Sequence, residues 1–187
     1  TLNNYFSKIY CINLDRRPDR WEQCMIEFNE INVDVERISA IDGKNFPKSR
    51  MGIKPGAHGL VLTNIKILED AISNRYESIL IFEDDVKFVA DFNRIFNEKI
   101  NNLPSDWNLL YLGGIHKIKP KNNEYDIYKT SSTITTHAVG INSNFFQTLL
   151  ESIKKNMTSP IDKIQQRLQQ NNNAYTFVPS IAMQRSS

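Results

Sequence analysis

Several features that would assign this chain to a common class are missing from its sequence. It has no run of about 18 apolar residues, so no segment is predicted to cross a membrane as a helix. It has neither a G-x-G-x-x-G fingerprint nor a P-loop lysine motif, so no glycine-rich loop is available to hold a phosphate. The net charge is only +2 over 187 residues, which argues against a nucleic-acid partner.

Histidine and cysteine, which often act as metal ligands or as partners in nucleophilic catalysis, are also scarce. The three histidines, His58, His116 and His137, are scattered, and no Ser-His-Asp or Cys-His pairing has local support. His137 falls inside a predicted strand, which favours a packed or acceptor-side histidine over a metal ligand. Cys11 and Cys24 lack metal-type spacing and each lies in an apolar run, so we expect two buried free thiols.

The composition that remains is that of an ordinary globular protein, with 40% hydrophobic and 24% charged residues. This length is sufficient for a real core, so we expect a single domain over residues 1–187, with one module of a longer polypeptide as the alternative. Residues 1–4 do not read as a signal peptide. We expect a cytoplasmic protein of a bacterium or virus, with the lumen of the endoplasmic reticulum as the alternative.

The most informative stretch is a short apolar run followed by three acids. Ile79 to Phe82 is typical of a strand buried on both faces, and Glu83, Asp84 and Asp85 follow without a gap. Because an interior strand does not carry three adjacent carboxylates, the chain is predicted to leave the sheet there. Three carboxylates repel one another, and a divalent cation is their usual counter-charge. The alternative is an acidic turn without a ligand.

Strand and helix patterns alternate through the first half of the chain. This alternation predicts an α/β fold, a Rossmann-like and mostly parallel central sheet with helices on both faces. Residues 44–58 are predicted to form a loop and residues 117–129 an exposed excursion. The predicted strands cover residues 6–14, 33–38, 79–82, 107–112, 134–141 and 175–178. The predicted helices cover residues 18–29, 59–72, 91–100, 143–155 and 161–170.

Right-handed crossovers bring the ends of the first three strands to one edge of such a sheet, where ligands bind in open α/β folds. We therefore expect residues 13–15, residues 41–42 and residues 83–85 to converge. Without a glycine-rich loop, a metal ion would have to hold the phosphates of any bound nucleotide. Arg16, Arg17 and Arg20 either face a phosphate or form a solvated helix start.

A series of motifs covers nearly the whole chain in a fixed order. These are I-N-L-D-R-R-P-D-R at 12–20, I-S-A-I-D-G at 38–43, the helix from residue 59, E-D-D at 83–85, T-H-A-V-G-I at 136–141, P-I-D at 160–162 and P-S-I-A-M-Q-R-S-S at 179–187. Together they resemble glycosyltransferase family 25, which includes bacterial lipooligosaccharide transferases and collagen galactosyltransferases. One departure is Thr63-Asn64, where the family usually has Ser-His, and this leaves the donor and acceptor choice open.

This resemblance implies a GT-A fold and an inverting transfer of a hexose, galactose or glucose, from a UDP-sugar to a hydroxyl of a glycan or a hydroxylysine-type protein acceptor. It makes the acidic triplet a form of the D-x-D motif, in which Asp85 binds Mn²⁺ or Mg²⁺. It places Glu83 near the ribose of the donor and leaves Asp84 to bind the metal or the donor sugar.

The resemblance also implies roles for residues outside the triplet. Asp162 is the candidate general base, with a plain acid in the first turn of a helix as the alternative. Gln184 and Ser186 match positions that close over the donor phosphates, with a polar tail as the alternative. The converging strand ends add Asn13, Leu14 and Asp15 as candidates for donor binding. Asp42 could bond the nucleoside, with an ordinary turn residue as the alternative.

Two rival functions remain compatible with the sequence. A metal-dependent phosphoryl-transfer enzyme also places acids at strand ends, but it would need a second acid cluster or an essential lysine after another strand. A non-catalytic sugar-binding or structural domain could retain the same fold.

Overall fold

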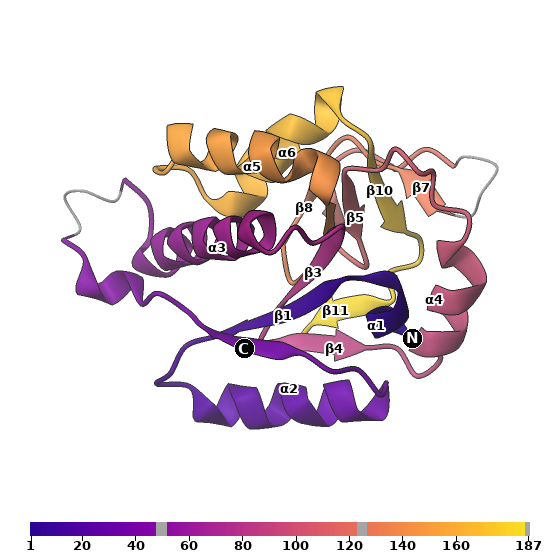
Figure 1. The fold of residues 1–187 in the computed structure, drawn as a ribbon, viewed down its shortest axis with the longest axis horizontal. Coiled ribbons are helices and arrows are strands. Elements are labelled where there is room, and N and C mark those ends of the chain that lie inside the picture. Colours follow the sequence, from indigo (N-terminus) through magenta and orange to yellow (C-terminus); the bar gives the residue numbers. More distant parts are fainter. Residues whose placement is uncertain (48–51, 123–126, 186–187) are drawn as a thin grey trace.

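The computed structural model describes residues 1–47, 52–122 and 127–185. Its centre is a seven-stranded sheet in the order β2-β1-β3-β9-β5-β10-β7 (Figure 1). Five strands run in one direction, and only β9 and β7 run against their neighbours. The predicted α/β fold with a mostly parallel sheet is therefore confirmed. The strands are β1 (Lys8–Asn13), β2 (Glu36–Ser39), β3 (Ser78–Glu83), β5 (Leu109–Tyr111), β7 (Ile127–Lys129), β9 (Ala138–Asn142) and β10 (Ala174–Phe177).

Helices cover both faces of this sheet, as the sequence predicts. In Figure 1, α3, α5 and α6 lie above the sheet and α2 lies below it. None of the helices in the described part of the chain is long and apolar enough to cross a membrane. The helices are α1 (Leu2–Tyr5), α2 (Pro18–Glu30), α3 (Pro55–Ser73), α4 (Phe92–Ile100), α5 (Ser143–Lys155) and α6 (Ile161–Leu168), with two 3₁₀ turns, η1 (Gly43–Asn45) and η3 (Gln169–Asn171).

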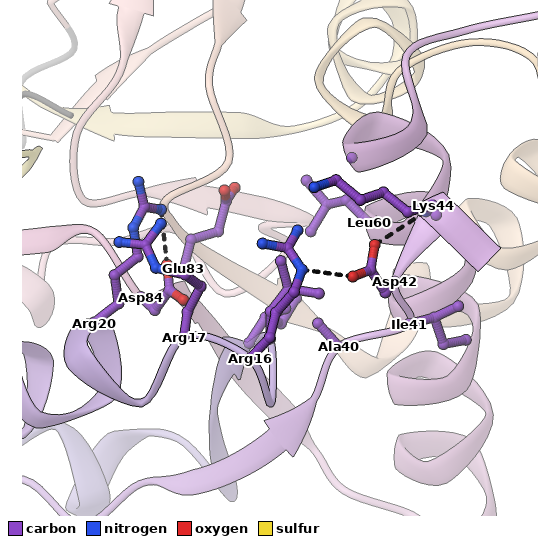
Figure 2. A pocket seen from close by; sticks show the side chains of 14 residues that line it. Arg16, Arg17, Arg20, Ala40, Ile41, Asp42, Lys44, Leu60, Glu83 and Asp84 are labelled. Atoms are coloured by element: carbon purple, nitrogen blue, oxygen red, sulfur yellow. Dashed lines mark hydrogen bonds and ion pairs between the residues drawn. The ribbon is translucent and has the colours of Figure 1, made fainter.

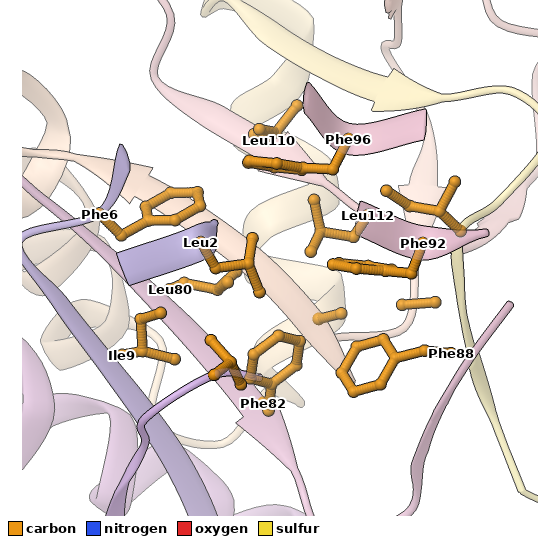
Figure 3. Packing of buried hydrophobic residues seen from close by; sticks show 14 of the residues in the cluster. Leu2, Phe6, Ile9, Leu80, Phe82, Phe88, Phe92, Phe96, Leu110 and Leu112 are labelled. Atoms are coloured by element: carbon orange, nitrogen blue, oxygen red, sulfur yellow. The ribbon is translucent and has the colours of Figure 1, made fainter. Parts of the chain in front are cut away.

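The core is divided into two clusters because successive side chains of a strand point to opposite faces. In β1, Ile9 and Cys11 belong to the cluster that includes side chains of α2 and α4. Tyr10 and Ile12 belong to the cluster that includes side chains of α3, α5 and α6. Strand β3 divides its side chains in the same way. The first cluster is rich in aromatic rings, several of which are visible in Figure 3. Both faces of the central strands are thus buried, as the apolar run in β3 predicts.

The two cysteines belong to the aromatic-rich cluster. Cys11 and Cys24 are free and buried, and their Sγ atoms lie 3.8 Å apart. The prediction of buried free thiols is confirmed.

Two pairs of short strands lie outside the main sheet. Strand β4 (Val86–Phe88) pairs with β11 (Ala182–Gln184), and β6 (Ile115–His116) pairs with β8 (Thr133–Ile134), both antiparallel. The sequence predicts none of these pairings, because two or three residues are too few to show a periodic pattern. The β4–β11 pair matters for the site, since it brings the end of the described chain beside Asp85.

Several element boundaries differ from the sequence prediction, and three of the differences have a clear description. Helix α3 begins at Pro55 rather than near Gly59, because proline at the first helical position has a suitable φ and needs no amide donor. The strand predicted over residues 134–141 is divided, because Thr135 adopts φ 77° and interrupts it. The excursion predicted over residues 117–129 ends in β7, whose Ile127 is buried. Parts of the predicted loop and excursion, residues 48–51 and 123–126, lie outside the described residues.

Glycines allow the start of α3 to contact the turn after β2. A Cβ atom added to Gly59 would overlap the carbonyl oxygen of Ile41, and one added to Gly43 would overlap that of Pro55. Gly56, in the same helical turn as Gly59, has nothing within 4 Å of the corresponding position. The close approach therefore depends on Gly43 and Gly59, and it closes one side of the site described below.

This difference predicts opposite effects for two alanine substitutions in one helix. Gly59→Ala forces the helix away from the turn and should lower the free energy of unfolding by roughly 1–3 kcal/mol, as overpacking does. Gly56→Ala is the matched control and should be neutral or stabilising, because alanine is the better helix former. Urea denaturation of both variants measures the difference, and equal effects would contradict the packing argument.

Candidate active site

The candidate site lies where β1, β2 and β3 end. Asn13 is in register with Ser39 of β2, and Ile12 is in register with Glu83 of β3. A cavity of about 320 Å³ opens at this edge, and Leu14, Asp42 and Glu83 are among the residues of its wall (Figure 2). The predicted convergence of the three strand ends is therefore confirmed.

This cavity, which we call the first cavity, has an apolar part, here called its floor, and a charged part, here called its rim. The floor includes Leu14, Ile41 and Leu60, and the rim includes Arg16, Asp42 and Lys44. At the rim, the Arg16 Nε donates a hydrogen bond of 2.6 Å to Asp42 Oδ2, and the Arg16 guanidinium lowers the pKa of that carboxyl (Figure 2). Asp42 Oδ1 accepts a second hydrogen bond, of 3.0 Å, from the Lys44 amide. A planar group on the floor and an anion at the rim would both find suitable partners here.

Asp84 is buried and both of its carboxylate oxygens have partners. The Asn13 Nδ2 donates to Oδ2 at 2.7 Å, and the Arg20 Nη1 donates to Oδ1 at 3.2 Å. Asn13 in turn accepts two hydrogen bonds from the Arg37 guanidinium, at 2.9 and 2.7 Å. Asn13 therefore contacts Asp84 and is not among the residues that line the first cavity. The network holds the turn after β3 in a fixed position.

Asp85 differs from Asp84 because one of its carboxylate oxygens, which we call the open oxygen, accepts no hydrogen bond from the described residues. Its Oδ1 is buried and has no hydrogen-bond partner among the described residues, and its Oδ2 lies 3.4 Å from the Gln184 Nε2. The Arg185 amide donates a 2.7 Å hydrogen bond to the Asp85 carbonyl oxygen, which continues the β4–β11 pairing. A buried carboxylate oxygen without a donor is a suitable ligand for a hard divalent cation.

Protein groups alone would not complete the coordination of a cation here. The described residues contain no group of three or more His, Cys, Asp or Glu side chains arranged to hold a metal ion. Mg²⁺, however, usually binds through one or two carboxylates, several waters and the phosphates of a substrate. The open oxygen of Asp85 fits that kind of site, in which the ligand itself supplies further oxygens.

Glu83 connects the first cavity to a second one of about 240 Å³. Thr136 donates a 2.7 Å hydrogen bond to Glu83 Oε1 from the second cavity's wall. Burial raises the pKa of the Glu83 carboxyl to about 7, the Thr136 hydrogen bond lowers it, and the charges of Asp85, Asp84 and Asp162 add to the rise. At neutral pH this carboxyl is therefore protonated in part of the molecules and can donate as well as accept a hydrogen bond.

Asp162 lies on the wall of the second cavity, in the first turn of α6. Its Oδ1 accepts a 2.8 Å hydrogen bond from the Lys163 amide, and the side chain is only partly buried. Helix α6 is fixed to the sheet by Gln165, whose Oε1 accepts a 2.9 Å hydrogen bond from the buried Tyr111 hydroxyl. Asp162 and Glu83, far apart in the sequence, thus face one cavity together with Gln184.

The structure separates the remaining predicted residues. Asp15 turns away from the first cavity, is 69% exposed, and pairs with Arg37 at 2.8 Å. Ser186 lies outside the described residues. His137 is buried, and its Nε2 lies 3.2 Å from the Ala182 carbonyl oxygen, as expected for a packed histidine.

The site also includes residues that the sequence left between two alternatives or did not predict. Arg16, Arg17 and Arg20 all line the first cavity, so the phosphate-facing alternative for this helix start agrees with their positions. Lys44 and Leu60 carry no motif signal. They reach the cavity because Gly43 and Gly59 allow α3 to approach the turn after β2 closely. Thr136 and Arg185 lie in stretches that resemble the family, but nothing in their spacing indicates a contact with the acidic triplet.

The sheet order and the cavity at the strand ends define an α/β domain with a mostly parallel central sheet and a ligand-sized cavity at the carboxyl ends of its strands. The crystal structure of A197 from STIV has a similar fold, with a TM-score of 0.50 over 96% of this chain and 86% of that chain, at 14% sequence identity. The model of glycosyltransferase family 25 (LPS biosynthesis protein) matches residues 6–161, and the chain belongs to this family.

Curated relatives of the chain include enzymes and a protein named as inactive. Procollagen galactosyltransferase 2 of Mus musculus is 29% identical over 129 residues, which is 58% of this chain and 21% of that protein. Inactive glycosyltransferase 25 family member 3 of Homo sapiens is 26% identical over 129 residues, 58% of this chain and 22% of that protein. The chain thus matches only about a fifth of the length of these relatives.

The unequal surroundings of Asp84 and Asp85 predict unequal effects on stability. Asp84→Asn removes the charge that faces Arg20 and should lower the free energy of unfolding by roughly 1–3 kcal/mol. Asp85→Asn removes no protein hydrogen bond shorter than the 3.4 Å contact with Gln184 and should be near neutral. Chemical denaturation without added metal tests both variants, and an equal loss in Asp85→Asn would contradict the open-oxygen description.

Proposed function

We propose that this domain transfers a hexose, galactose or glucose, from a uridine diphosphate sugar to a hydroxyl group of a glycan or protein acceptor, with inversion at the sugar carbon. The observation that carries the proposal is the position of the open Asp85 oxygen in the turn after β3. Asp85 lines a cavity together with Asp84, Arg17 and Arg20, and these three residues also line the first cavity. Membership of glycosyltransferase family 25 supports the reaction class.

The first cavity is the proposed donor site. The nucleoside would lie on the apolar floor, with Asp42 and Glu83 as hydrogen-bond partners. The diphosphate would extend toward the turn after β3, where Arg17, Arg20 and Arg185 line a further cavity of about 300 Å³ around Asp84 and Asp85. Guanidinium groups bind phosphate oxygens with short, charge-assisted hydrogen bonds.

Mn²⁺ or Mg²⁺ is the proposed cofactor, held by Asp85 and by the donor itself. When bound, such an ion stabilises the negative charge that the leaving diphosphate gains. Asp84 belongs to the same proposed metal group, but both of its oxygens already have protein partners, so its main task is to hold the turn and Arg20 in position. Gln184 contacts Asp85 and would limit the movement of its carboxylate.

Asp162 is the proposed general base. It lies on the wall of the second cavity, which Glu83 also lines, and there an acceptor hydroxyl could approach the sugar on the side away from the diphosphate. Its only described side-chain hydrogen bond is to the amide of the next residue, which leaves the carboxylate able to accept a proton. In direct displacement the base takes the hydroxyl proton while the diphosphate leaves with the bonding electron pair.

The acceptor class rests on relatives that the chain matches only in part. The name of the mouse relative supports a protein acceptor, and the description of the family model supports a lipopolysaccharide-type glycan. We retain both, with the nucleotide sugar as the small-molecule partner.

A non-catalytic domain is the second candidate, because the inactive human relative matches the same share of this chain as the mouse enzyme does. Release of uridine diphosphate from a UDP-hexose, measured with and without Mn²⁺, separates the two. A catalytic domain should hydrolyse the donor slowly when metal is present. Absence of hydrolysis with every UDP-hexose and acceptor tested would favour the second candidate.

Donor recognition can be tested by ligand-induced stabilisation. Uridine diphosphate should raise the melting temperature only when Mn²⁺ or a similar ion is present, because a ligand that binds the native state stabilises it by mass action. Asp85→Asn should fold normally and lose this metal-dependent shift. Differential scanning fluorimetry measures both effects, with adenosine and guanosine diphosphates as controls. An equal shift with those nucleotides, or an unchanged shift in the variant, would contradict the assignment.

The role of Asp162 predicts a separation of turnover from donor binding. Asp162→Asn should reduce kcat by roughly 10²–10⁴-fold, the usual contribution of a positioned general base. The affinity for the uridine diphosphate sugar should remain nearly the same, because the carboxylate acts on the acceptor. Steady-state kinetics and calorimetry provide the two measurements. Loss of donor binding would move Asp162 to the donor site, and full activity would reduce it to a plain first-turn acid.

A further inference from the structure

The segment between β8 and β9 contains a backbone conformation that its sequence does not favour. Thr135 has φ 77°, in the left-handed region that glycine adopts without strain. Asn32 and Arg75 also have positive φ, but they lie just after α2 and α3, where such turns are common. A β-branched residue with positive φ is a true outlier, and such outliers occur mostly at functional sites.

The hydroxyl group of Thr135 is a second unfavourable feature of the same residue. Its Oγ1 is buried and has no hydrogen-bond partner among the described residues. It lies beside the backbone of Gly114, since a Cβ atom added to that glycine would be 3.5 Å from it. The neighbouring Thr136, by contrast, donates its hydroxyl to Glu83. A buried hydroxyl without a partner costs free energy, so Thr135 combines strain with an unsatisfied polar group.

Thr135 lies on the wall of the second cavity, which is suited to a polyhydroxylated group. The polar part of this wall includes Thr135, Asp162 and Gln184, and the apolar part includes Leu60. Leu60 and Glu83 line both cavities, so the second cavity adjoins the first. A ligand with its nucleoside in the first cavity would place the group attached to its diphosphate in the second.

We infer that Thr135 is a specificity-determining residue, whose hydroxyl forms a hydrogen bond with a hydroxyl group of the donor hexose in the second cavity. This inference rests on the proposed function, because it requires a nucleotide sugar in the adjoining site. It accounts for both unfavourable features, since the sugar supplies the missing partner and the left-handed backbone holds the threonine at the wall. A turn without this role would adopt the same φ with glycine at no cost in strain.

The test compares ligands with and without the hexose in matched variants. Thr135→Val removes the hydroxyl and keeps the branched shape, Thr135→Ser keeps the hydroxyl, and Thr148→Val removes an exposed hydroxyl on α5 as a control. Calorimetry with Mn²⁺ measures the affinity for uridine diphosphate, UDP-galactose and UDP-glucose. Thermal unfolding without ligand measures whether the hydroxyl contributes to the fold.

The expected result is a selective loss in Thr135→Val. Its affinity for the UDP-hexose that the unmodified protein prefers should fall by roughly 3- to 10-fold, the contribution of one hydrogen bond. Its affinity for uridine diphosphate should be unchanged, and its melting temperature should not fall, because no protein hydrogen bond is lost. Thr135→Ser and Thr148→Val should retain the affinity for the UDP-hexose.

Other outcomes overturn the inference in distinguishable ways. If Thr135→Val retains full affinity for the UDP-hexose, Thr135 does not recognise the sugar. The same conclusion follows if its affinity for uridine diphosphate falls as much as its affinity for the UDP-hexose. A marked fall in the melting temperature of Thr135→Val assigns the hydroxyl to the fold instead. If the unmodified protein binds none of the three nucleotides, the proposed function fails, and this inference fails with it.

Discussion

Strand β3 must bury apolar side chains on both faces of the sheet and then end in three adjacent carboxylates. Leu80 and Phe82 are buried in one core cluster, and Ile79 and Ile81 are buried in the other. The carboxylates cannot enter either cluster unpaired, because an uncompensated charge in a core is costly. The chain therefore leaves the sheet at Glu83, at the edge where β1 and β2 also end. The position of the site follows from this single constraint on burial and charge.

The three carboxylates perform different tasks because their surroundings differ. Burial raises the pKa of Glu83 to about 7, which makes it a group that can donate or accept a hydrogen bond between two cavities. Asp84 is held by Asn13 and Arg20 and fixes the turn. Asp85 retains an open oxygen in the described structure. Neighbouring residues of one chemical type thus supply a hydrogen-bonding group, a structural anchor and a candidate metal ligand.

The second cavity depends on contacts between distant parts of the chain. Helix α6 brings Asp162 to one side of it, and the β4–β11 pair brings Gln184 to another. The strained turn at Thr135 completes the wall. Two glycines, Gly43 and Gly59, allow α3 to approach the turn after β2 and so close the first cavity. The proposed transfer reaction needs both cavities, and Glu83 is where they meet.

The sequence by itself determined the α/β class, the central strand and the strand end that carries the acids, because apolar runs and helical spacing are local patterns. It also identified the family, through motifs in the correct order. It did not determine which acid has an open oxygen, because that depends on Asn13 and Arg20, which reach Asp84 from β1 and α2. Nor did it reveal β4, β11 or the conformation of Thr135, since strands of two or three residues and a single strained φ leave no periodic signal. Those features are decided by packing between segments that lie far apart in the chain.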